Sequence, residues 1–183
     1  MKYQPTDVEG AFVVSLEPRG DERGFFARVF CAEEFGRQGL DGTVSQVNTS
    51  ASAHAGTLRG MHYQVAPHGE AKLVKCIRGA VFDVVLDLRE GSATFGRWAG
   101  ATLTPENRLM MYAPKGCAHG FLTLEDDTEM LYTASAPYQG AAERIIRWND
   151  PKFAIAWPRQ PAVLSPKDQD AGDYDPPLHR SGY

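Results

Sequence analysis

The chain of 183 residues is 43% hydrophobic and 23% charged, a balance that is ordinary for globular proteins and excludes a disordered or membrane-spanning class. Its formal net charge is -4, and Lys and Arg are scattered without a basic run, so we expect no nucleic-acid partner and no membrane partner. The first residues lack the apolar segment of a signal peptide, and no apolar run approaches the roughly 20 residues of a membrane span. A cytoplasmic location is therefore expected.

Short β-type segments, separated by Gly, Pro, Asp or Asn, follow one another along the chain and predict an all-β protein. One short helix is expected over residues 31–40. The predicted strands cover residues 11–18, 24–30, 43–50, 71–77, 80–88, 98–104, 108–114, 120–124, 128–135 and 144–148. This spacing is typical of a sandwich or barrel. We expect a single domain over residues 1–183, with a jelly roll at approximately 40–140 and N- and C-terminal extensions packing around it.

Residues 80–88 alternate with the period of two that is typical of a strand. The even positions from Phe82 to Leu88 are apolar, and we expect them to face the core. The odd positions carry two carboxylates, Asp83 and Asp87, which are expected to face solvent or to line a wet cavity.

The C-terminal segment, from Trp157 onward, is rich in Pro and predicts an extended loop. Its last dozen residues are expected either to pack on a partner or to fray. The predicted strands and their ends are therefore the first candidates for carrying catalytic or binding residues.

Two of the five histidines stand among glycines and polar residues, His62 in GTLRGMHYQ and His119 in APKGCAHGF. The segment PKGCAH has the Pro-x-Gly-x-x-His form of the second cupin motif, in which a turn presents a His to the mouth of a jelly-roll barrel. The first cupin motif would have a second His where Gln64 stands. A metal site built from His62, His119 and Glu70 is an alternative, but this spacing does not suit neighbouring inward positions on one strand. We expect no metal and no cofactor.

Without a metal, a His can act as a base near neutral pH when a carboxylate holds its tautomer. Arg23, Arg59 and Lys72 flank the same motifs. Arg suits bidentate capture of phosphate oxygens and Lys suits a localised oxyanion, whereas the alternative for each is an ordinary surface charge. The aromatic residues, Tyr132 and Tyr138 among them, are equally compatible with core packing. The residues alone therefore predict an all-β domain with a cavity lined by His and Arg.

Eleven short motifs occur in an order that is more specific than any one of them. Over nearly its whole length the chain resembles the dTDP-4-dehydrorhamnose 3,5-epimerase family, through DERGFF, QVNTS, GTLRGMHYQ, KLVKCIRG, FDVVLDLR, TFGRW, PKGCAHGF, the Tyr of EMLYTAS, IIRWNDP, IAWP and LSPKD. The resemblance implies a cupin-type jelly-roll barrel with short peripheral helices and an extended C-terminal segment. It also implies a homodimer that has no metal or cofactor and that binds a nucleotide sugar.

The resemblance assigns catalytic roles to a small set of residues. The family's catalytic His matches His62 and its partner carboxylate matches Asp168, so this pair would be the general base. Lys72 matches the Lys beside the 4-keto oxygen, where a cation, with His119 as a second donor, would stabilise the enolate that forms when an adjacent carbon loses its proton. Tyr132 matches the Tyr on the opposite face of the sugar and would donate a proton there. Inversion of a carbon requires an acid and a base on opposite faces.

The resemblance also implies a set of substrate-binding residues. The matching positions are Arg23, Arg59, Gln46, Asn48, Tyr138 and Phe26. The two arginines would bind the diphosphate, the two amides would line the ligand cleft, and the two aromatic rings would contact the nucleobase. In the family, Phe26 often comes from the neighbouring subunit.

Arg28, in GFFARVF, departs from the family, which usually has a Glu there that helps to accept the imide N–H of thymine. The exchange replaces an acceptor by a donor, and a guanidinium suits the edges of cytosine or guanine better than thymine N3–H. Because Gln46 can still pair with an imide, a dTDP sugar is the first expectation, and CDP- and GDP-linked sugars are the alternatives. Thr133 follows the catalytic Tyr where the family often has Lys, and whether one carbon or both are inverted stays open.

We therefore expect an isomerase that inverts carbon 3, carbon 5 or both in a nucleotide-linked 4-keto-6-deoxyhexose. The first candidate reaction converts dTDP-4-dehydro-6-deoxyglucose to dTDP-4-dehydrorhamnose. Two alternatives belong to other classes, a metal-dependent cupin enzyme and a non-catalytic cupin that binds a sugar nucleotide or serves in assembly. A mere binder does not need an acid and a base in opposition, so the set of His62, Asp168, Lys72 and Tyr132 favours the enzyme.

Overall fold

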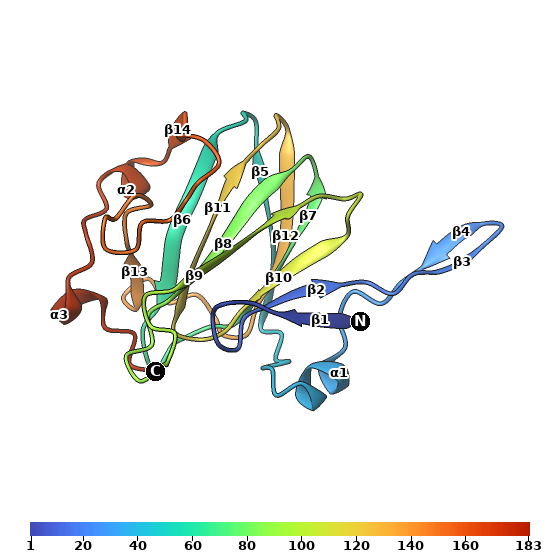
Figure 1. The fold of residues 1–183 in the computed structure, drawn as a ribbon, viewed down its shortest axis with the longest axis horizontal. Coiled ribbons are helices and arrows are strands. Elements are labelled where there is room, and N and C mark those ends of the chain that lie inside the picture. The colour runs from blue at the N-terminus through green and yellow to red at the C-terminus, as the bar shows by residue number, and fades with distance from the viewer.

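In the computed structural model, which describes all 183 residues, two sheets face each other (Figure 1). The first sheet contains, in spatial order, β1 (Lys2–Pro5), β2 (Phe12–Ser15), β10 (Leu109–Ala113), β7 (Lys72–Arg78), β12 (Thr128–Ala134) and β5 (Gln46–Ser52). The second contains β13 (Glu143–Ile145), β6 (Thr57–Gln64), β11 (Cys117–Thr123), β8 (Val81–Asp87) and β9 (Trp98–Leu103), and β14 (Val163–Leu164) pairs with β6. The strands are antiparallel to their neighbours, except that β14 runs parallel to β6.

Three short helices and a separate hairpin complete the fold. The helices are α1 (Ala32–Arg37), α2 (Pro166–Gln169) and α3 (Pro176–His179), and the hairpin joins β3 (Arg19–Asp21) to β4 (Gly24–Phe26). The prediction of an all-β, jelly-roll fold with short peripheral helices is confirmed, although the two sheets do not close into one continuous barrel. Each predicted strand overlaps an observed one, but β1, β3, β6 and β14 are additional, and the strand predicted over 24–30 ends at Phe26.

A hydrophobic core fills the space between the two sheets. Its buried members include Val74, Val81, Val85, Leu103, Met111, Cys117, Phe121 and Met130. Tyr132 packs against this core and Phe121 belongs to it, and both side chains also line the cavity described below. Full burial of one such aliphatic side chain stabilises the folded state by about 1.5–3 kcal/mol. Many such contacts together hold the strands that carry the cavity residues.

The two faces of β8 do not follow the prediction. Asp83 and Asp87, expected to face solvent or a wet cavity, are 0% exposed and lie on the inner face with Val81 and Val85. Of the even positions, Val84, Leu86 and Leu88 are buried as expected and Phe82 is partly buried, but they lie on the outer face of the second sheet, where they form a second apolar layer. Both faces of β8 are buried because side chains from residues 146–174 cover the outer face of this sheet.

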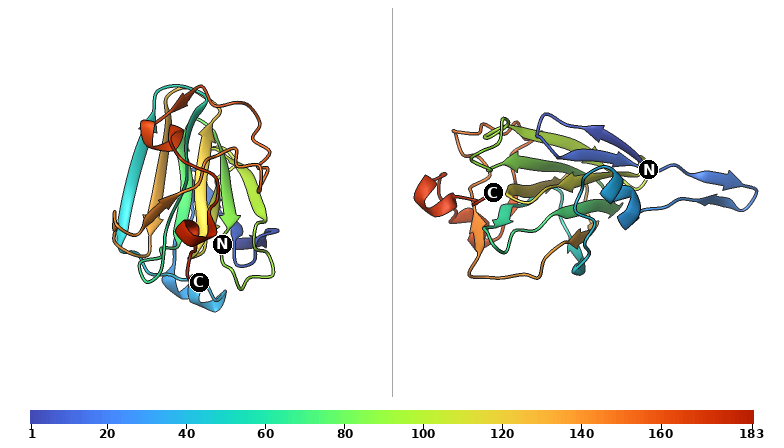
Figure 2. Two further views of the ribbon diagram at one scale, coloured as in Figure 1. Left: turned by 90° about the vertical axis from the view of Figure 1, so that its left-hand side faces the viewer. Right: turned by 90° about the horizontal axis from the view of Figure 1, so that it is seen from below.

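The C-terminal segment is an ordered cover on the second sheet: it is extended as predicted apart from β14 and the two short helices, but its last residues pack on their own chain and do not fray. In the left view of Figure 2, the segment with α2 and α3 lies across the strands. Tyr63 Oη donates to the carbonyl of His179 at 2.7 Å, and the backbone N–H of Ala66 donates to that of Ser181 at 2.9 Å. A proline at the first position of each helix suits its start, because that position needs no N–H donor.

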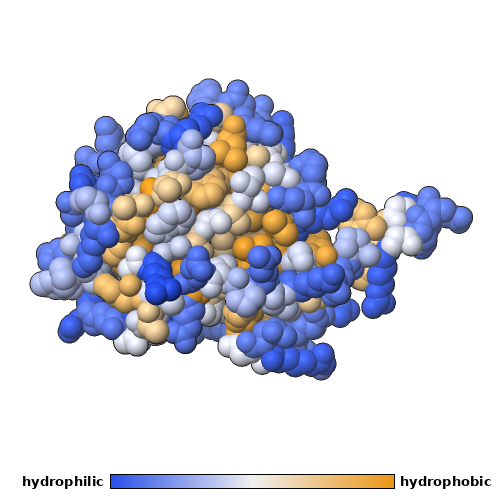
Figure 3. Space-filling view, in the orientation of Figure 1, coloured by the Kyte–Doolittle hydropathy of each residue, from blue (hydrophilic) through white to orange (hydrophobic).

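The β3–β4 hairpin, residues 19–26, projects from the body as an arm (Figure 1 and the right view of Figure 2). Phe25 and Phe26 are 54% and 68% exposed on it. In Figure 3 the tip of the arm is hydrophilic and apolar colour appears nearer its base. Near that base, α1 buries Phe35 against an outer part of the first sheet. None of the helices has the length and apolar character that crossing a bilayer requires.

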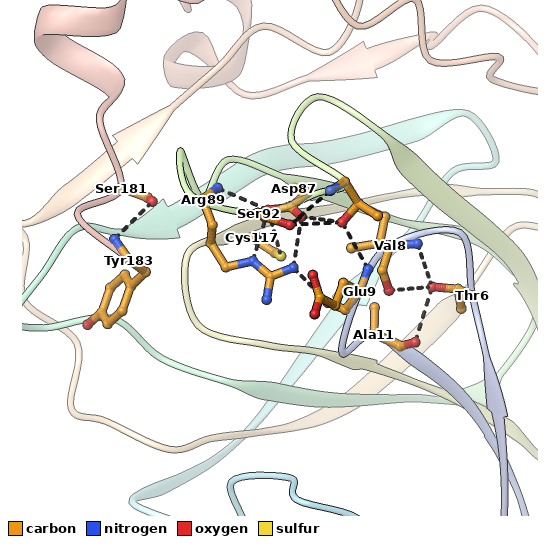
Figure 4. Close-up of polar contacts among 11 residues, drawn as sticks. Thr6, Val8, Glu9, Ala11, Asp87, Arg89, Ser92, Cys117, Ser181 and Tyr183 are labelled. Atoms are coloured by element: carbon orange, nitrogen blue, oxygen red, sulfur yellow. Dashed lines mark hydrogen bonds and ion pairs between the residues drawn. The ribbon is translucent and has the colours of Figure 1, made fainter.

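Asp87 is the centre of a polar cluster that ties the N-terminal loop to the turn after β8 (Figure 4). Its carboxylate accepts hydrogen bonds from the backbone and guanidinium of Arg89 and from the hydroxyls of Ser92 and Thr94, at 2.6–2.9 Å. Arg89 in turn donates to the carbonyl of Glu9 at 2.6 Å. Burial works to raise the pKa of Asp87, but these donors outweigh it and lower the pKa to about 2.

Candidate active site

Two adjoining cavities, of about 400 Å³ and about 310 Å³, open between the sheets and share the side chains of His62, Lys72 and Tyr132. The larger is lined by Ser50, Thr57, Leu58, Arg59, His119, Phe121, Val163, Leu164, Ser165 and Asp168 in addition. The smaller is lined by Gln46, Asn48, Tyr63, Gln64, Glu70, Ala134, Tyr138 and Glu143 in addition. The three shared residues mark the place where a ligand that fills both cavities would react.

His62, on β6, forms a tight pair with Asp168, on α2. Nε2 of the imidazole lies 2.5 Å from Oδ1 of the carboxylate, and the side chains are 28% and 3% exposed. The ionised carboxylate accepts from Nε2–H, which leaves Nδ1 as the unprotonated nitrogen, without a protein partner. This arrangement orients the ring as a base and stabilises the imidazolium that forms when the ring takes up a proton.

The segment LSPKD holds Asp168 in place through the first turn of α2. Ser165 caps the helix, since its hydroxyl accepts from the N–H of Asp168 at 3.1 Å and donates to Oδ2 of the same residue at 2.9 Å. Burial works to raise the pKa of Asp168, but the hydrogen bonds from His62 and Ser165 outweigh burial and lower the pKa. Asp168 is therefore an ionised, fixed acceptor.

A second His–Asp pair lies beside the first. His119, on β11, stands opposite His62 in the strand register, and its Nε2 lies 2.9 Å and 3.1 Å from the two carboxylate oxygens of Asp83. A Cβ on Gly60 would lie 2.5 Å from the Cα of Gly120, so the glycines of GTLRGMHYQ and CAHGF permit β6 and β11 to approach closely here. Burial raises the pKa of Asp83, while the neighbouring His119 opposes the rise.

Lys72 and Tyr132 face these histidines from the other sheet. Lys72 begins β7 and Tyr132 lies in the neighbouring β12, whereas His62 and His119 lie on β6 and β11 of the second sheet. Nζ of Lys72 lies 2.9 Å from Oε1 of Glu70. Burial raises the pKa of Tyr132, so its phenol stays protonated to higher pH than a free tyrosine. The cavity therefore has imidazoles on one sheet and a phenol on the opposite sheet, groups that can accept and donate a proton.

Four of the predicted substrate-binding residues line the same cavities. Gln46 and Asn48 stand on β5 at alternate positions, which point to one face of the sheet. Oε1 of Gln46 accepts from the backbone N–H of Tyr138 at 3.2 Å. Arg59, on β6, lines the larger cavity and donates to the carbonyl of Ala51 at 3.0 Å.

The other three predicted binding residues, Arg23, Phe26 and Arg28, lie on or beside the arm, and the chain does not bring them to its own cavity. Arg23 pairs with Asp21 within the hairpin, and its side chain is 85% exposed. Phe26 and Arg28 line a separate hollow at the base of the arm. Arg28 lies 3.5 Å from Glu34 there, so its guanidinium faces a carboxylate of its own chain. Arg23 and Phe26 belong to the arm that projects from the body in Figure 1, whereas Arg28 follows it in the chain.

Sequence reasoning did not select Ser50 or Glu143, which the structure places in the cavity walls. Ser50 continues the alternation of Gln46 and Asn48 along β5, and its buried hydroxyl has no hydrogen-bond partner. Glu143, on β13, accepts from the hydroxyl of Tyr138 at 2.9 Å and pairs with Lys167 at 2.5 Å. The period of two on β5 is a signal for Ser50, but no pattern in the sequence indicates Glu143.

The residues weighed as metal ligands have other partners. No group of three His, Cys, Asp or Glu side chains is arranged to hold a metal ion. His62 and His119 each pair with an aspartate, and Glu70 pairs with Lys72. Gln64, at the second His position of the cupin motif, uses its amide for hydrogen bonds to the backbone of His68, Pro137 and Gln139.

Comparison with known proteins agrees with this geometry. A model of the dTDP-4-dehydrorhamnose 3,5-epimerase family matches residues 5–175 of the chain. The chain belongs to this epimerase family. A dTDP-4-dehydrorhamnose 3,5-epimerase of Sinorhizobium fredii is 45% identical over 169 residues, which are 92% of this chain and 87% of that protein. The chain is therefore an isomerase with a cupin-type fold.

Two further members of the epimerase family show its range. A dTDP-4-dehydrorhamnose 3-epimerase of Streptomyces niveus is 40% identical over 172 residues, 93% of this chain and 83% of that protein. The crystal structure of a dTDP-6-deoxy-D-glucose-3,5-epimerase from Legionella pneumophila, in complex with dTDP-4-keto-L-rhamnose, has a TM-score of 0.87 and 38% identity. The match covers 94% of this chain and 92% of that one. The family therefore includes relatives named for one carbon and relatives named for two.

Proposed function

We propose that the chain inverts one or both carbons beside the ketone of a nucleotide-linked 4-keto-6-deoxyhexose, with dTDP-4-dehydro-6-deoxyglucose as its first candidate substrate and dTDP-4-dehydrorhamnose as the product. One observation carries the proposal. The His62–Asp168 pair and the phenol of Tyr132 come from opposite sheets and line the same cavity. A carbon held between them can lose a proton to one wall and regain a proton from the other, which inverts it.

In this mechanism His62 takes the proton from the carbon and Asp168 stabilises the imidazolium through Nε2–H. The electron pair moves onto the ketone oxygen, where the ammonium of Lys72 stabilises the enolate. His119 lines the same cavity and serves as a second donor to that oxygen. A single donor of this kind is worth about 3–4 kcal/mol in other enzymes, so two of them lower the barrier substantially. Tyr132 then protonates the carbon from the opposite side.

The nucleotide would occupy the smaller cavity and the cleft beside Arg59. Tyr138 supplies an exposed ring for the base, and Gln46 and Asn48 supply donors and acceptors for a pyrimidine edge. The relative from Legionella pneumophila that binds a dTDP sugar favours dTDP. In its own chain Arg28 pairs with Glu34 beside the arm. A nucleobase that Arg28 contacted in a second copy would be one rich in hydrogen-bond acceptors, so CDP and GDP sugars are the alternatives.

We propose that the protein works as a homodimer in which each arm reaches the other copy. Arg23 and Phe26 are exposed on the arm, and neither side chain lines the two cavities of its own chain. The outer face of the first sheet also leaves apolar side chains uncovered, with Val47 61%, Ile77 39% and Leu131 36% exposed. A second copy packed on this face would bury these apolar side chains. The arm of each copy would then bring Phe26 to the nucleobase, and Arg23 to the diphosphate, of the ligand bound in the other copy.

Solvent deuterium uptake tests the proposed function. Purified protein is mixed with dTDP-4-dehydro-6-deoxyglucose in deuterated water, and proton NMR follows carbons 3 and 5. Uptake at both carbons indicates a 3,5-epimerase, and uptake at one carbon indicates a single-carbon epimerase. If only the CDP- or GDP-linked sugar exchanges, the nucleobase assignment is wrong. If none of the three sugars exchanges while dTDP still binds in calorimetry, the chain is a binding protein and the proposal fails.

The central residue is tested in the same assay with His62→Ala. Loss of the base should slow deuterium uptake at least about 100-fold, since general base catalysis contributes about 10²–10⁴-fold. The matched control is His54→Ala, because His54 lies on a turn outside both cavities and its side chain takes no part in the proposed chemistry. Undiminished exchange in His62→Ala would remove the assigned base.

A further inference from the structure

Glu70 is a carboxylate that the proposed chemistry does not use, although it stands at the cavity. Its Oε1 lies 2.9 Å from Nζ of Lys72, and the two side chains are 10% and 13% exposed. No other carboxylate pairs with Lys72. The remaining carboxylates around the cavities have partners of their own, namely His62 for Asp168, His119 for Asp83, and Tyr138 and Lys167 for Glu143.

The loop that carries Glu70 is held on several sides. The backbone N–H of Gly69 donates to the hydroxyl of Tyr183 at 2.7 Å, and that of Ala71 donates to the hydroxyl of Ser135 at 2.8 Å. The side-chain amide of Gln64 donates to the carbonyl of His68 at 2.9 Å. These bonds tie the loop to the C-terminus, to the end of β12 and to β6. The backbone on both sides of Glu70 is therefore fixed, and its carboxylate contacts Lys72 without a ligand.

A fixed carboxylate matters for Lys72 because a lysine side chain has four rotatable bonds and about 2 kcal/mol of rotamer entropy to lose when it is ordered. An ammonium group has three N–H donors. The ion pair with Glu70 restrains the position of the nitrogen, and N–H donors remain for a ligand oxygen. A nearly buried cation is also stabilised by an adjacent carboxylate, which offsets the loss of its hydration.

The charge of Glu70 acts on Tyr132 as well. Burial is the main reason for the raised pKa of Tyr132, and the negative charge of Glu70 raises the pKa further, whereas Arg59 opposes both. The other charged or titratable side chains that line the cavities with this phenol are those of His62, Lys72, His119, Asp168, Glu143, Tyr63 and Tyr138.

We propose that Glu70 is a positioning residue for the epimerase reaction, which holds the ammonium of Lys72 toward the ketone oxygen. The inference rests on the proposed function and adds a fifth residue to it. Glu70 itself does not touch the reacting atoms. It acts through its ion pair with Lys72 and through its charge on Tyr132.

The variant Glu70→Gln tests the role, since it keeps the size and one acceptor but removes the charge. We expect kcat to fall about tenfold at neutral pH with KM within about twofold, because the loss lies in stabilisation of the transition state. The alkaline limb of the kcat profile should also move to lower pH, because the negative charge of Glu70 contributes to the raised pKa of Tyr132. Glu129→Gln is the matched control, because Glu129 is on the same strand as Tyr132 but pairs with Arg78 outside the cavity.

A readout without substrate separates this inference from the proposed function. Tyrosinate absorbance is titrated in the wild type, in Glu70→Gln and in Tyr132→Phe, and the difference from Tyr132→Phe isolates the phenol of Tyr132. Ionisation at lower pH in Glu70→Gln supports the inference even if the tested sugar proves to be wrong. If the wild type turns over but Glu70→Gln leaves both kcat and the alkaline limb unchanged, Glu70 has only a structural role and the inference is overturned.

Glu70→Asp covers the case in which the Gln variant does not fold. It retains the charge on a side chain one methylene shorter, so the contact with Lys72 should lengthen while the field at Tyr132 persists. We expect a lower kcat with an alkaline limb close to that of the wild type. A kcat equal to that of the wild type would contradict the positioning of Lys72.

Discussion

Asp83 and Asp87 stand four residues apart on the same inner face of β8, and neither exposes any surface, yet their surroundings differ sharply. Asp87 accepts five hydrogen bonds from Arg89, Ser92 and Thr94. The carboxylate of Asp83 has a hydrogen-bond partner only in the imidazole of His119. As a result the pKa of Asp87 is lowered to about 2, whereas that of Asp83 is raised by burial.

Ionised Asp87 therefore stabilises the folded protein, whereas ionised Asp83 does not. The ionised form of Asp87 is favoured in the folded protein, because every lone pair has a donor. The ionised form of Asp83 is disfavoured by folding, since one imidazole does not replace the water that it lost. A poorly solvated carboxylate beside a cavity is expected where chemistry needs it, and it is retained at the expense of stability.

The largest effect is expected from Asp87→Asn. The substitution leaves the guanidinium of Arg89, whose side chain is 18% exposed, without its counterion and replaces one acceptor oxygen by a donor. Removal of one partner of a buried pair typically costs about 3–5 kcal/mol of unfolding free energy. We expect a loss of this size in urea unfolding at a fixed protein concentration, with kcat of the remaining folded protein within about twofold of the wild type.

A matched control for this variant is Asp126→Asn, which removes a carboxylate from an exposed loop, where Asp126 accepts only a backbone N–H from Ala55. It should cost about 1 kcal/mol or less. If Asp87→Asn were no more destabilising than Asp126→Asn, the polar cluster in Figure 4 would not be a stabilising feature.

Acid should weaken the same cluster in a pH range set by its pKa. Asp87 has a folded pKa of about 2 against an ordinary value of 3.8, so its contribution is complete above about pH 4 and is lost as the pH falls through about 2. The difference corresponds to about 2 kcal/mol. The stability gap between the wild type and Asp87→Asn should therefore shrink by about this amount between pH 5 and pH 2. A gap that stays constant would show that Asp87 is not ionised preferentially in the fold.

The two aspartates also show which features of β8 can be predicted from the sequence and which cannot. The alternation of residues 80–88 predicts the strand, but it also suggests solvent or a wet cavity for Asp83 and Asp87, and both are fully buried. The prediction fails because the outer face of β8 is covered by side chains such as Phe153 and Trp157, more than 60 residues later. A period of two indicates which residues share a face, but the covering of that face is a tertiary property.

The site shows the same limit in another form. His62 and Asp168 are 106 residues apart, and no spacing brings them together, so only the resemblance of LSPKD to a family motif connects them. The structure adds the distance of 2.5 Å and the capping by Ser165 that fixes it. Arg23 and Phe26 on the arm, and Arg28 just after it, do not line the two cavities between the sheets of their own chain. Residues that act across an interface leave no periodic signal in their own strand.

The smallest effect, and the sharpest test of the comparison, is expected from Asp83→Asn. Because folding disfavours the ionised form of Asp83, loss of the charge should cost no more than about 1 kcal/mol of unfolding free energy and could even stabilise the protein. The amide can still hold the ring of His119, but it no longer favours a positive charge there, so kcat should fall about tenfold, which corresponds to about 1.4 kcal/mol. Parallel urea unfolding and deuterium-exchange assays would measure both quantities. If Asp83→Asn instead lost as much stability as Asp87→Asn and kept full activity, the two aspartates would have the same structural role, and His119 would have no part in the proposed enolate site.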